Sequence, residues 1–113
     1  MEFDTESVDG ATGEVAVIRP HGRLTMITTA ELRTLVADTV GGGRTHVVVD
    51  LSRTEFVDSS GLGALISGLK TARQAGGDLR IAGAGPQVEA VLDLTNLRRV
   101  LRPRPDVAGA FAD

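Results

Sequence analysis

The sequence predicts an α/β domain whose sheet is largely parallel. Residues 47–49 are three consecutive valines, and a β-branched run without polar alternation is typical of a strand covered on both faces. About eight residues further on, the apolar positions recur at helical spacing before a glycine stop at residues 75–77; they are Leu62, Leu65, Ile66, Leu69 and Ala72. Residues 79–82 supply the next strand, so that a strand, a helix and a parallel strand form a right-handed crossover.

The composition indicates one folded, soluble domain. The chain has 113 residues, a hydrophobic fraction of 42% and a mean hydropathy of +0.06. It contains no cysteine, which excludes disulfides, thiolate metal sites and thiol redox sensing. His21 and His46 are too few for a multi-histidine metal site. We therefore expect no metal and no cofactor.

The charge and the first residues bear on partners and location. A net charge of −3 and a pI of about 5.3 argue against a general affinity for nucleic acid or anionic lipid. The start of the chain, Met1 to Asp4, is acidic and lacks the basic and apolar regions of a signal peptide, and no apolar run approaches a membrane span. We expect a cytoplasmic protein that binds neither nucleic acid nor membrane, with a monomer as the default state.

The N-terminal third predicts a hairpin. Within residues 1–13, residues 1–8 are either a frayed edge strand or a flexible arm, and residues 9–13 form a turn. Residues 15–18 form a strand closed by Pro20 and Gly22. Together these two segments could form an antiparallel pair.

The first helix is predicted to begin at a capping box. Thr28 would be the N-cap and Glu31 the reciprocal N3 residue, and an apolar stripe then continues to the stop at residues 41–43. Two large apolar residues, Met26 and Ile27, occupy the preceding loop, where polar residues are expected. They either tuck under the helix as a hydrophobic staple or form an exposed patch that binds a partner.

The C-terminal third begins with a glycine-rich turn into a helix at Pro86. A dinucleotide-binding fingerprint would need a third glycine where the chain has Val88, so we favour an ordinary strand–helix turn with Pro86 at the first helical position and Asn96 at the C-terminal cap. Four arginines around Val100 and Leu101 predict a short, charge-protected edge strand over residues 98–104 rather than a phosphate site. Residues 106–111 predict a last helix that docks Val107 and Phe111 on the sheet.

The most informative segment is Asp58-Ser59-Ser60-Gly61-Leu62-Gly63, between the valine strand and its helix. The first three residues are N-cap types, and a helix N-terminus tolerates an anion such as phosphate. The segment is either a capped helix whose glycines allow tight packing or a functional site. Val57 replaces the first glycine of a nucleophile elbow and neither histidine can be placed beside Ser59, so we predict no enzyme.

The segment from Phe56 to Gly63 resembles the signature of the STAS domain, in particular that of stand-alone bacterial anti-anti-sigma factors. Supporting context extends from Glu14 to Phe111 and includes residues 21–24, 75–79 and 86–97. The resemblance implies a single STAS domain over residues 1–113. It also implies a mixed, mostly parallel sheet of four to five strands with about four helices packed mainly on one side.

The resemblance also implies a function. In this family the unphosphorylated protein binds an anti-sigma factor, often a serine kinase of the histidine-kinase-like ATPase type, and so frees a sigma factor for transcription. Phosphorylation of the serine that corresponds to Ser59 ends binding, and a PP2C-like phosphatase restores it. Asp58 would orient the loop, and the partner-binding surface would comprise Asp58, Ser60, Gly61, Leu62, Arg23, Thr25, Met26 and Ile27.

One departure and two alternatives accompany this hypothesis. Many phosphorylated relatives carry Glu and Asp where this chain has Arg23 and Thr25, which makes its surface less negative. The chain could instead be a phosphorylation-independent STAS module in a larger regulatory assembly. A third hypothesis is a small nucleotide-binding protein that uses the Ser59 loop or the Gly83 loop.

Overall fold

The protein is an α/β domain, and its structure, a computed structural model, describes residues 2–10 and 13–111. Within these residues the chain forms five strands and four helices. The strands are β1 (Glu2–Gly10), β2 (Gly13–Leu24), β3 (His46–Asp50), β4 (Thr54–Val57) and β5 (Asp78–Ala82). The helices are α1 (Thr29–Gly41), α2 (Ser59–Gln74), α3 (Pro86–Thr95) and α4 (Arg98–Leu101).

The sheet is mixed and mostly parallel, as predicted. Its order is β1-β2-β3-β5, and only the β1–β2 pair is antiparallel among the described strands. The segment that could have been a strand or an arm is therefore a strand, paired with β2 from Glu2 to Gly10. Met1 and two residues of the predicted turn, Ala11 and Thr12, lie outside the described residues. β3 and β4 both pair with β2, one after the other along its length.

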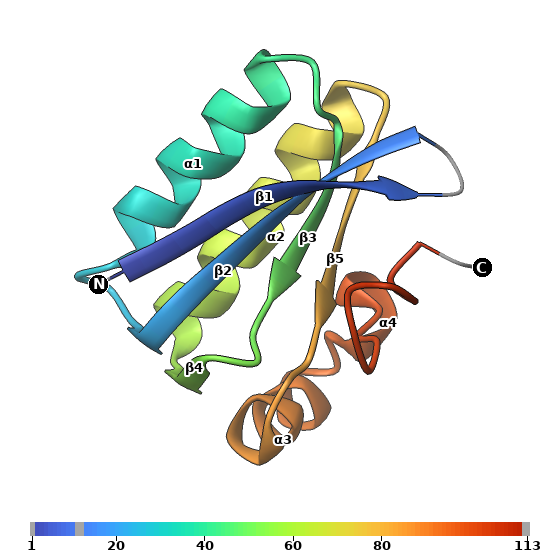
Figure 1. Ribbon diagram of the computed structural model, residues 1–113. Coiled ribbons are helices and arrows are strands. Elements are labelled where there is room, and N and C mark those ends of the chain that lie inside the picture. Colours follow the sequence, from blue (N-terminus) through green and yellow to red (C-terminus); the bar gives the residue numbers. More distant parts are fainter. Residues whose placement is uncertain (1, 11–12, 112–113) are drawn as a thin grey trace.

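The helices cover one face of the sheet. Figure 1 shows α1 and α2 side by side, with α2 passing behind the strands, α3 beyond the end of β5 and α4 beside that end. Inward-facing side chains of β3 and β5, such as Val49 and Ile81, belong to one apolar cluster with buried residues from all four helices. On the opposite face, Val107 and Phe111 pack against a smaller cluster that includes Val48 and Ala82. This confirms the predicted arrangement of the helices.

The predicted start of α1 is wrong, whereas the predicted ends of α3 are confirmed. The predicted capping box is wrong: the Thr28 hydroxyl accepts the Thr25 N–H at 3.0 Å and donates to the Arg23 carbonyl, so it closes the preceding loop instead of the helix. The C-terminal cap of α3 is as predicted, because Asn96 adopts the left-handed conformation with φ of 60°. Pro86 is the first residue of α3, also as predicted.

The end of the chain was predicted wrongly in its secondary structure. The expected edge strand is the single turn of helix α4, which ends where Arg102 turns left-handed with φ of 51°. Within this segment, Arg104 forms an isolated parallel β-bridge with Ala82 at the end of β5. The expected last helix is a series of turns, in which Asp106 accepts the Gly109 N–H at 2.9 Å. The predicted docking of this segment on the sheet is nevertheless observed.

Candidate functional site

Ser59 lies at the start of α2, on the outside of the molecule. The preceding residue, Asp58, is the N-cap of the helix: its backbone is extended and its carboxylate accepts the Gly61 N–H at 2.9 Å. Ser59 is then the first helical residue and is exposed, whereas Ser60 is half-buried. The hydroxyl of Ser59 therefore stands at the positive end of the helix dipole, where solvent or a partner can reach it.

Two contacts fix the corner between β4 and α2. The Asp58 N–H donates to the Leu24 carbonyl at 3.3 Å, which ties the corner to the end of β2. Gly61 faces the same carbonyl, and a Cβ built on it would lie 2.4 Å from the Leu24 oxygen. Only glycine allows the helix to approach β2 this closely, because real Cβ atoms do not come so near to an oxygen. The tight-packing interpretation therefore holds for Gly61.

Gly61 and Leu62 have packing roles. Gly61 is buried. Leu62 is only 5% exposed and belongs to the main apolar cluster. The inward face of α2 begins at these residues, so both offer a partner little surface. Asp58 and Ser60, which are half-buried, and Ser59 present the accessible surface of this end of the helix.

The predicted apolar loop is exposed and lies at the same edge of the sheet. Met26 is 74% exposed and Ile27 is 92% exposed, so the staple interpretation is wrong. This loop follows β2, and Ser59 follows β4; the two strands are parallel neighbours that end together at the paired residues Leu24 and Val57. The carboxyl ends of adjacent parallel strands thus place an apolar loop beside the serine.

The other two predicted contact residues, Arg23 near the end of β2 and Thr25 at the start of the loop, have defined contacts within the chain. The guanidinium of Arg23 lies 4.4 Å from the centre of the Phe56 ring on the neighbouring strand, in a cation–π contact. Thr25 is half-buried and donates its N–H to Thr28. Arg23 itself is exposed and contributes positive charge to this edge of the sheet.

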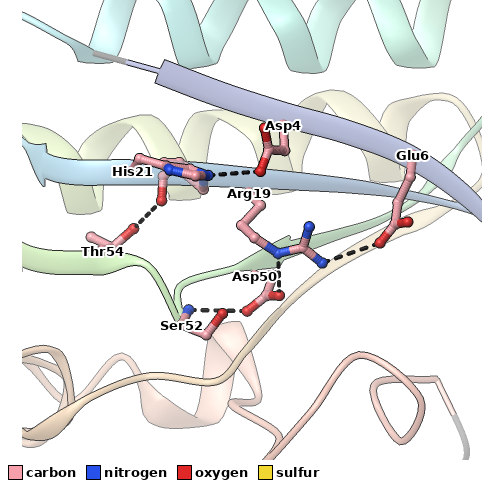
Figure 2. Close-up of polar contacts among 8 residues, drawn as sticks. Asp4, Glu6, Arg19, His21, Asp50, Ser52 and Thr54 are labelled. Carbon is pink, nitrogen blue, oxygen red and sulfur yellow. Dashed lines mark hydrogen bonds and ion pairs between the residues drawn. The ribbon is translucent and has the colours of Figure 1, made fainter.

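A polar network on the open face of the sheet holds the segment that leads to β4. Figure 2 shows the Asp50 carboxylate between Arg19, whose Nε donates at 2.7 Å, and the Ser52 N–H at 3.0 Å; Arg19 also contacts Glu6. Burial would raise the pKa of Asp50, but the hydrogen bonds from Arg19 and Ser52 outweigh it, and the pKa lies below its ordinary value. This charge pair fixes the end of β3.

The start of β4 is held in the same region. The Thr54 hydroxyl donates to the Pro20 carbonyl at 2.9 Å in a buried contact, which Figure 2 also shows. β4 and these contacts were not predicted from the sequence, because a four-residue strand has little periodic signal and the Thr54 contact in β2 is 34 residues away.

The Gly83 turn is filled by the chain itself. Gly83 has a φ of +68°, and a Cβ built on it would lie 2.9 Å from the Asp50 carboxylate oxygen. A phosphate in this turn would therefore meet a carboxylate, which disfavours the nucleotide hypothesis here.

Among residues 2–10 and 13–111, no group of three or more His, Cys, Asp or Glu side chains could hold a metal ion. None of the helices that the structure describes is long and apolar enough to span a membrane.

The fold and the site define a small α/β domain that presents an exposed serine and an apolar loop at one edge of its sheet. The STAS domain model matches residues 4–110. The chain belongs to the STAS domain family.

Two relatives of this chain are named as antagonists of anti-sigma factors. An anti-sigma F factor antagonist of Paenibacillus polymyxa is 34% identical over 56 residues, a match that covers 50% of this chain and 48% of the relative's length. The chain thus spans about half of that protein. An anti-sigma-B factor antagonist of Staphylococcus epidermidis is 27% identical over 84 residues, which cover 74% of this chain and 78% of the relative.

Solved structures show the same fold. The crystal structure of a Thermotoga maritima protein superposes with a TM-score of 0.82 at 27% identity, over 93% of this chain and 87% of that one. An anti-sigma factor antagonist from Mycobacterium paratuberculosis gives a TM-score of 0.79 at 24% identity, over 98% and 92% of the two chains. The second likeness is one of fold alone.

Proposed function

We propose that this chain is an anti-sigma factor antagonist that binds an anti-sigma factor and so releases a sigma factor for transcription. The names of relatives across the family support this proposal. The observation that carries it is the position of Ser59: it is exposed, it begins α2, and it lies at the same sheet edge as the exposed Met26 and Ile27. Ser59 is the phosphorylation site, and the apolar loop is the main contact surface.

The physical basis of the switch is local charge. A phosphate on Ser59 adds about −1.5 to −2 charges and three acceptor oxygens. At the first position of a helix this charge is compatible with the fold, because the first-turn N–H groups and the dipole favour an anion. The cost falls instead on a partner that buries the serine, and a few kcal/mol are enough to abolish a micromolar complex.

The proposal extends to the proteins that act on the switch. The partner is a serine kinase of the histidine-kinase-like ATPase type, which supplies its own ATP site, and a PP2C-like phosphatase reverses the modification. The chain itself acts in the cytoplasm as a binding protein rather than an enzyme. Arg23 and Thr25 shape the choice of partner, since Arg23 adds positive charge next to the apolar loop.

The test is a capture experiment with three variants and the wild type. Ser59→Asp should abolish capture of the anti-sigma factor, and Ser59→Ala should preserve it. Gln74→Glu is the matched control, because it adds the same charge at the exposed far end of the same helix; its capture should equal that of the wild type. Phosphopeptide mass spectrometry after incubation with the captured kinase and ATP should locate the phosphate on Ser59.

Unfolding measurements show whether a loss of capture in Ser59→Asp comes from weaker binding or from a less stable fold. Ser59→Asp should leave the free energy of unfolding unchanged or raise it by about 0.3–1 kcal/mol, because a negative charge at a helix N-terminus is stabilising. Equal capture by the wild type, Ser59→Asp and Ser59→Ala would contradict the switch and favour a phosphorylation-independent binding module.

A further inference from the structure

We infer that Gln87, in the first turn of α3, is a positioning residue that holds Ser59 in the orientation in which it is phosphorylated. The inference rests on the proposed function of Ser59. Its basis is a pair of hydrogen bonds between the Gln87 side chain and the backbone of Val57, two residues before Ser59 in sequence.

The Gln87 amide acts as a substitute for a neighbouring strand. Its Oε1 accepts the Val57 N–H at 2.9 Å, and its Nε2 donates to the Val57 carbonyl at 3.1 Å. A strand residue offers the same donor and acceptor to its neighbour through its own peptide groups. β4 is paired with β2 along its other edge, so the two bonds from α3 complete the pairing of its last residue.

The corner that carries Ser59 is thereby held from three sides. β2 accepts the Asp58 N–H through Leu24, the Asp58 carboxylate caps the first turn of α2 at Gly61, and Gln87 holds Val57 from α3. The first two contacts lie on Asp58 itself. Gln87 supplies the third, from an element 30 residues further along the chain.

Loss of this contact should affect the corner rather than the whole fold. Val57 is buried, so without Gln87 its N–H and carbonyl lose partners in a place that is shielded from water. The body of α2 stays in place, because Leu65, Leu69 and Ala72 remain packed in the core. The freedom gained therefore lies between Val57 and Ser59, where a displacement of about 1 Å can lower a transfer rate by up to two orders of magnitude.

Three variants separate positioning from stability. Gln87→Ala removes both hydrogen bonds. Gln87→Glu keeps the shape of the side chain and an acceptor for the Val57 N–H, but its carboxylate cannot donate to the Val57 carbonyl, so it serves if the alanine variant folds poorly. Val91→Ala is the matched control. Val91 packs α3 against the same core, and the described hydrogen bonds of the Val57 backbone to α3 come from Gln87.

The readout is steady-state phosphorylation of the intact chain by the anti-sigma kinase obtained in the capture experiment. Gln87→Ala should lower kcat about tenfold and change KM less than twofold, because the apolar loop that binds the kinase is intact. Gln87→Glu should also lower kcat, because its carboxylate faces the Val57 carbonyl and two acceptors repel each other. Val91→Ala should retain the wild-type kcat. Equal losses in Gln87→Ala and Val91→Ala, or a wild-type kcat in Gln87→Ala, would overturn the inference while the proposed function stands.

Amide hydrogen exchange measured by NMR tests, independently of any kinase, whether Gln87 holds this corner. In Gln87→Ala, exchange at the amides of Val57 and Gly61 should accelerate at least tenfold relative to Val91→Ala. If the wild type is not phosphorylated on Ser59, the proposed function fails by itself. In that case unchanged exchange at both amides also rejects the positioning role, and accelerated exchange retains Gln87 as the residue that holds this corner.

Discussion

Replacement of Gly61 by alanine provides a quantitative test of how α2 is seated. Alanine is normally the better helix residue by up to about 1 kcal/mol. At this position, however, its Cβ would lie 2.4 Å from the Leu24 carbonyl oxygen and 2.8 Å from a methyl carbon of Val57. An ordinary contact needs about 3.4 Å, so the helix or the end of β2 must move by roughly 1 Å. Such overpacking costs about 1–3 kcal/mol.

The same helix contains a matched control. A Cβ on Gly63 would have its nearest neighbour, a guanidinium nitrogen of Arg33, at 3.6 Å, which is an ordinary contact. Gly63→Ala should therefore raise the free energy of unfolding by up to about 1 kcal/mol through helix propensity. The two alanines should change stability in opposite directions although they lie two residues apart in one helix.

Urea unfolding followed by circular dichroism measures this difference. With a slope of about 1–3 kcal/mol per M, a loss of roughly 2 kcal/mol in Gly61→Ala lowers the midpoint by about 1 M. Gly63→Ala should raise the midpoint or leave it unchanged. If both variants were equally stable, the close approach of α2 to Leu24 would not be the reason for a glycine at position 61.

Three further outcomes follow from the site. Asp58→Ala should lower the free energy of unfolding by about 1 kcal/mol, measured by urea titration, because the Gly61 N–H loses its cap; wild-type stability would refute the capping role. Ile27→Ser should leave stability within about 0.5 kcal/mol and weaken capture of the anti-sigma factor at least tenfold by calorimetry, and undiminished affinity would remove this loop from the interface. Asp50 has a lowered pKa, so its contribution to stability is present above about pH 4 and disappears as the pH falls through the lower folded value. Asp50→Asn should therefore cost about 1.5–3 kcal/mol at pH 7 and progressively less as the pH falls below about 4 in parallel urea titrations, and a pH-independent difference would contradict the charge pair with Arg19.

The predictability of the fold depended on how far each element is specified by its own residues. The valine run of β3 and the periodicity of α2 predict their elements because burial on the sheet imposes those patterns locally. α4 was mistaken for a strand because Val100 and Leu101 are too few to show a period. Its helical turn is set by contacts that are distant in sequence, since Leu101 is buried in the cluster that α2 shares.

The residues of the site also divide into those specified by local sequence and those set by contacts distant in sequence. Asp58, Ser59 and Ser60 were all predicted to be possible caps from their types and their place before an apolar helix, and the structure shows that Asp58 is the cap. The exposure of Met26 and Ile27 was undecided, because a staple and an open loop have the same sequence pattern. Gln87 gave no signal, because an amide that pairs with a backbone 30 residues away resembles any polar residue in a first helical turn.

The geometry of the sheet edge explains how one phosphate could control a whole interface. β2 and β4 are paired, and neighbouring strands lie about 4.8 Å apart. The segments that follow them, with Ile27 after one strand and Ser59 after the other, therefore begin within about one Debye length, roughly 8 Å at physiological salt. A partner that buries Ile27 and Met26 gains about 1.5–3 kcal/mol from each side chain. It must then accept a phosphate of about −1.5 to −2 charges at a distance where salt screens little. The cost would offset much of that gain, while the fold stays unchanged.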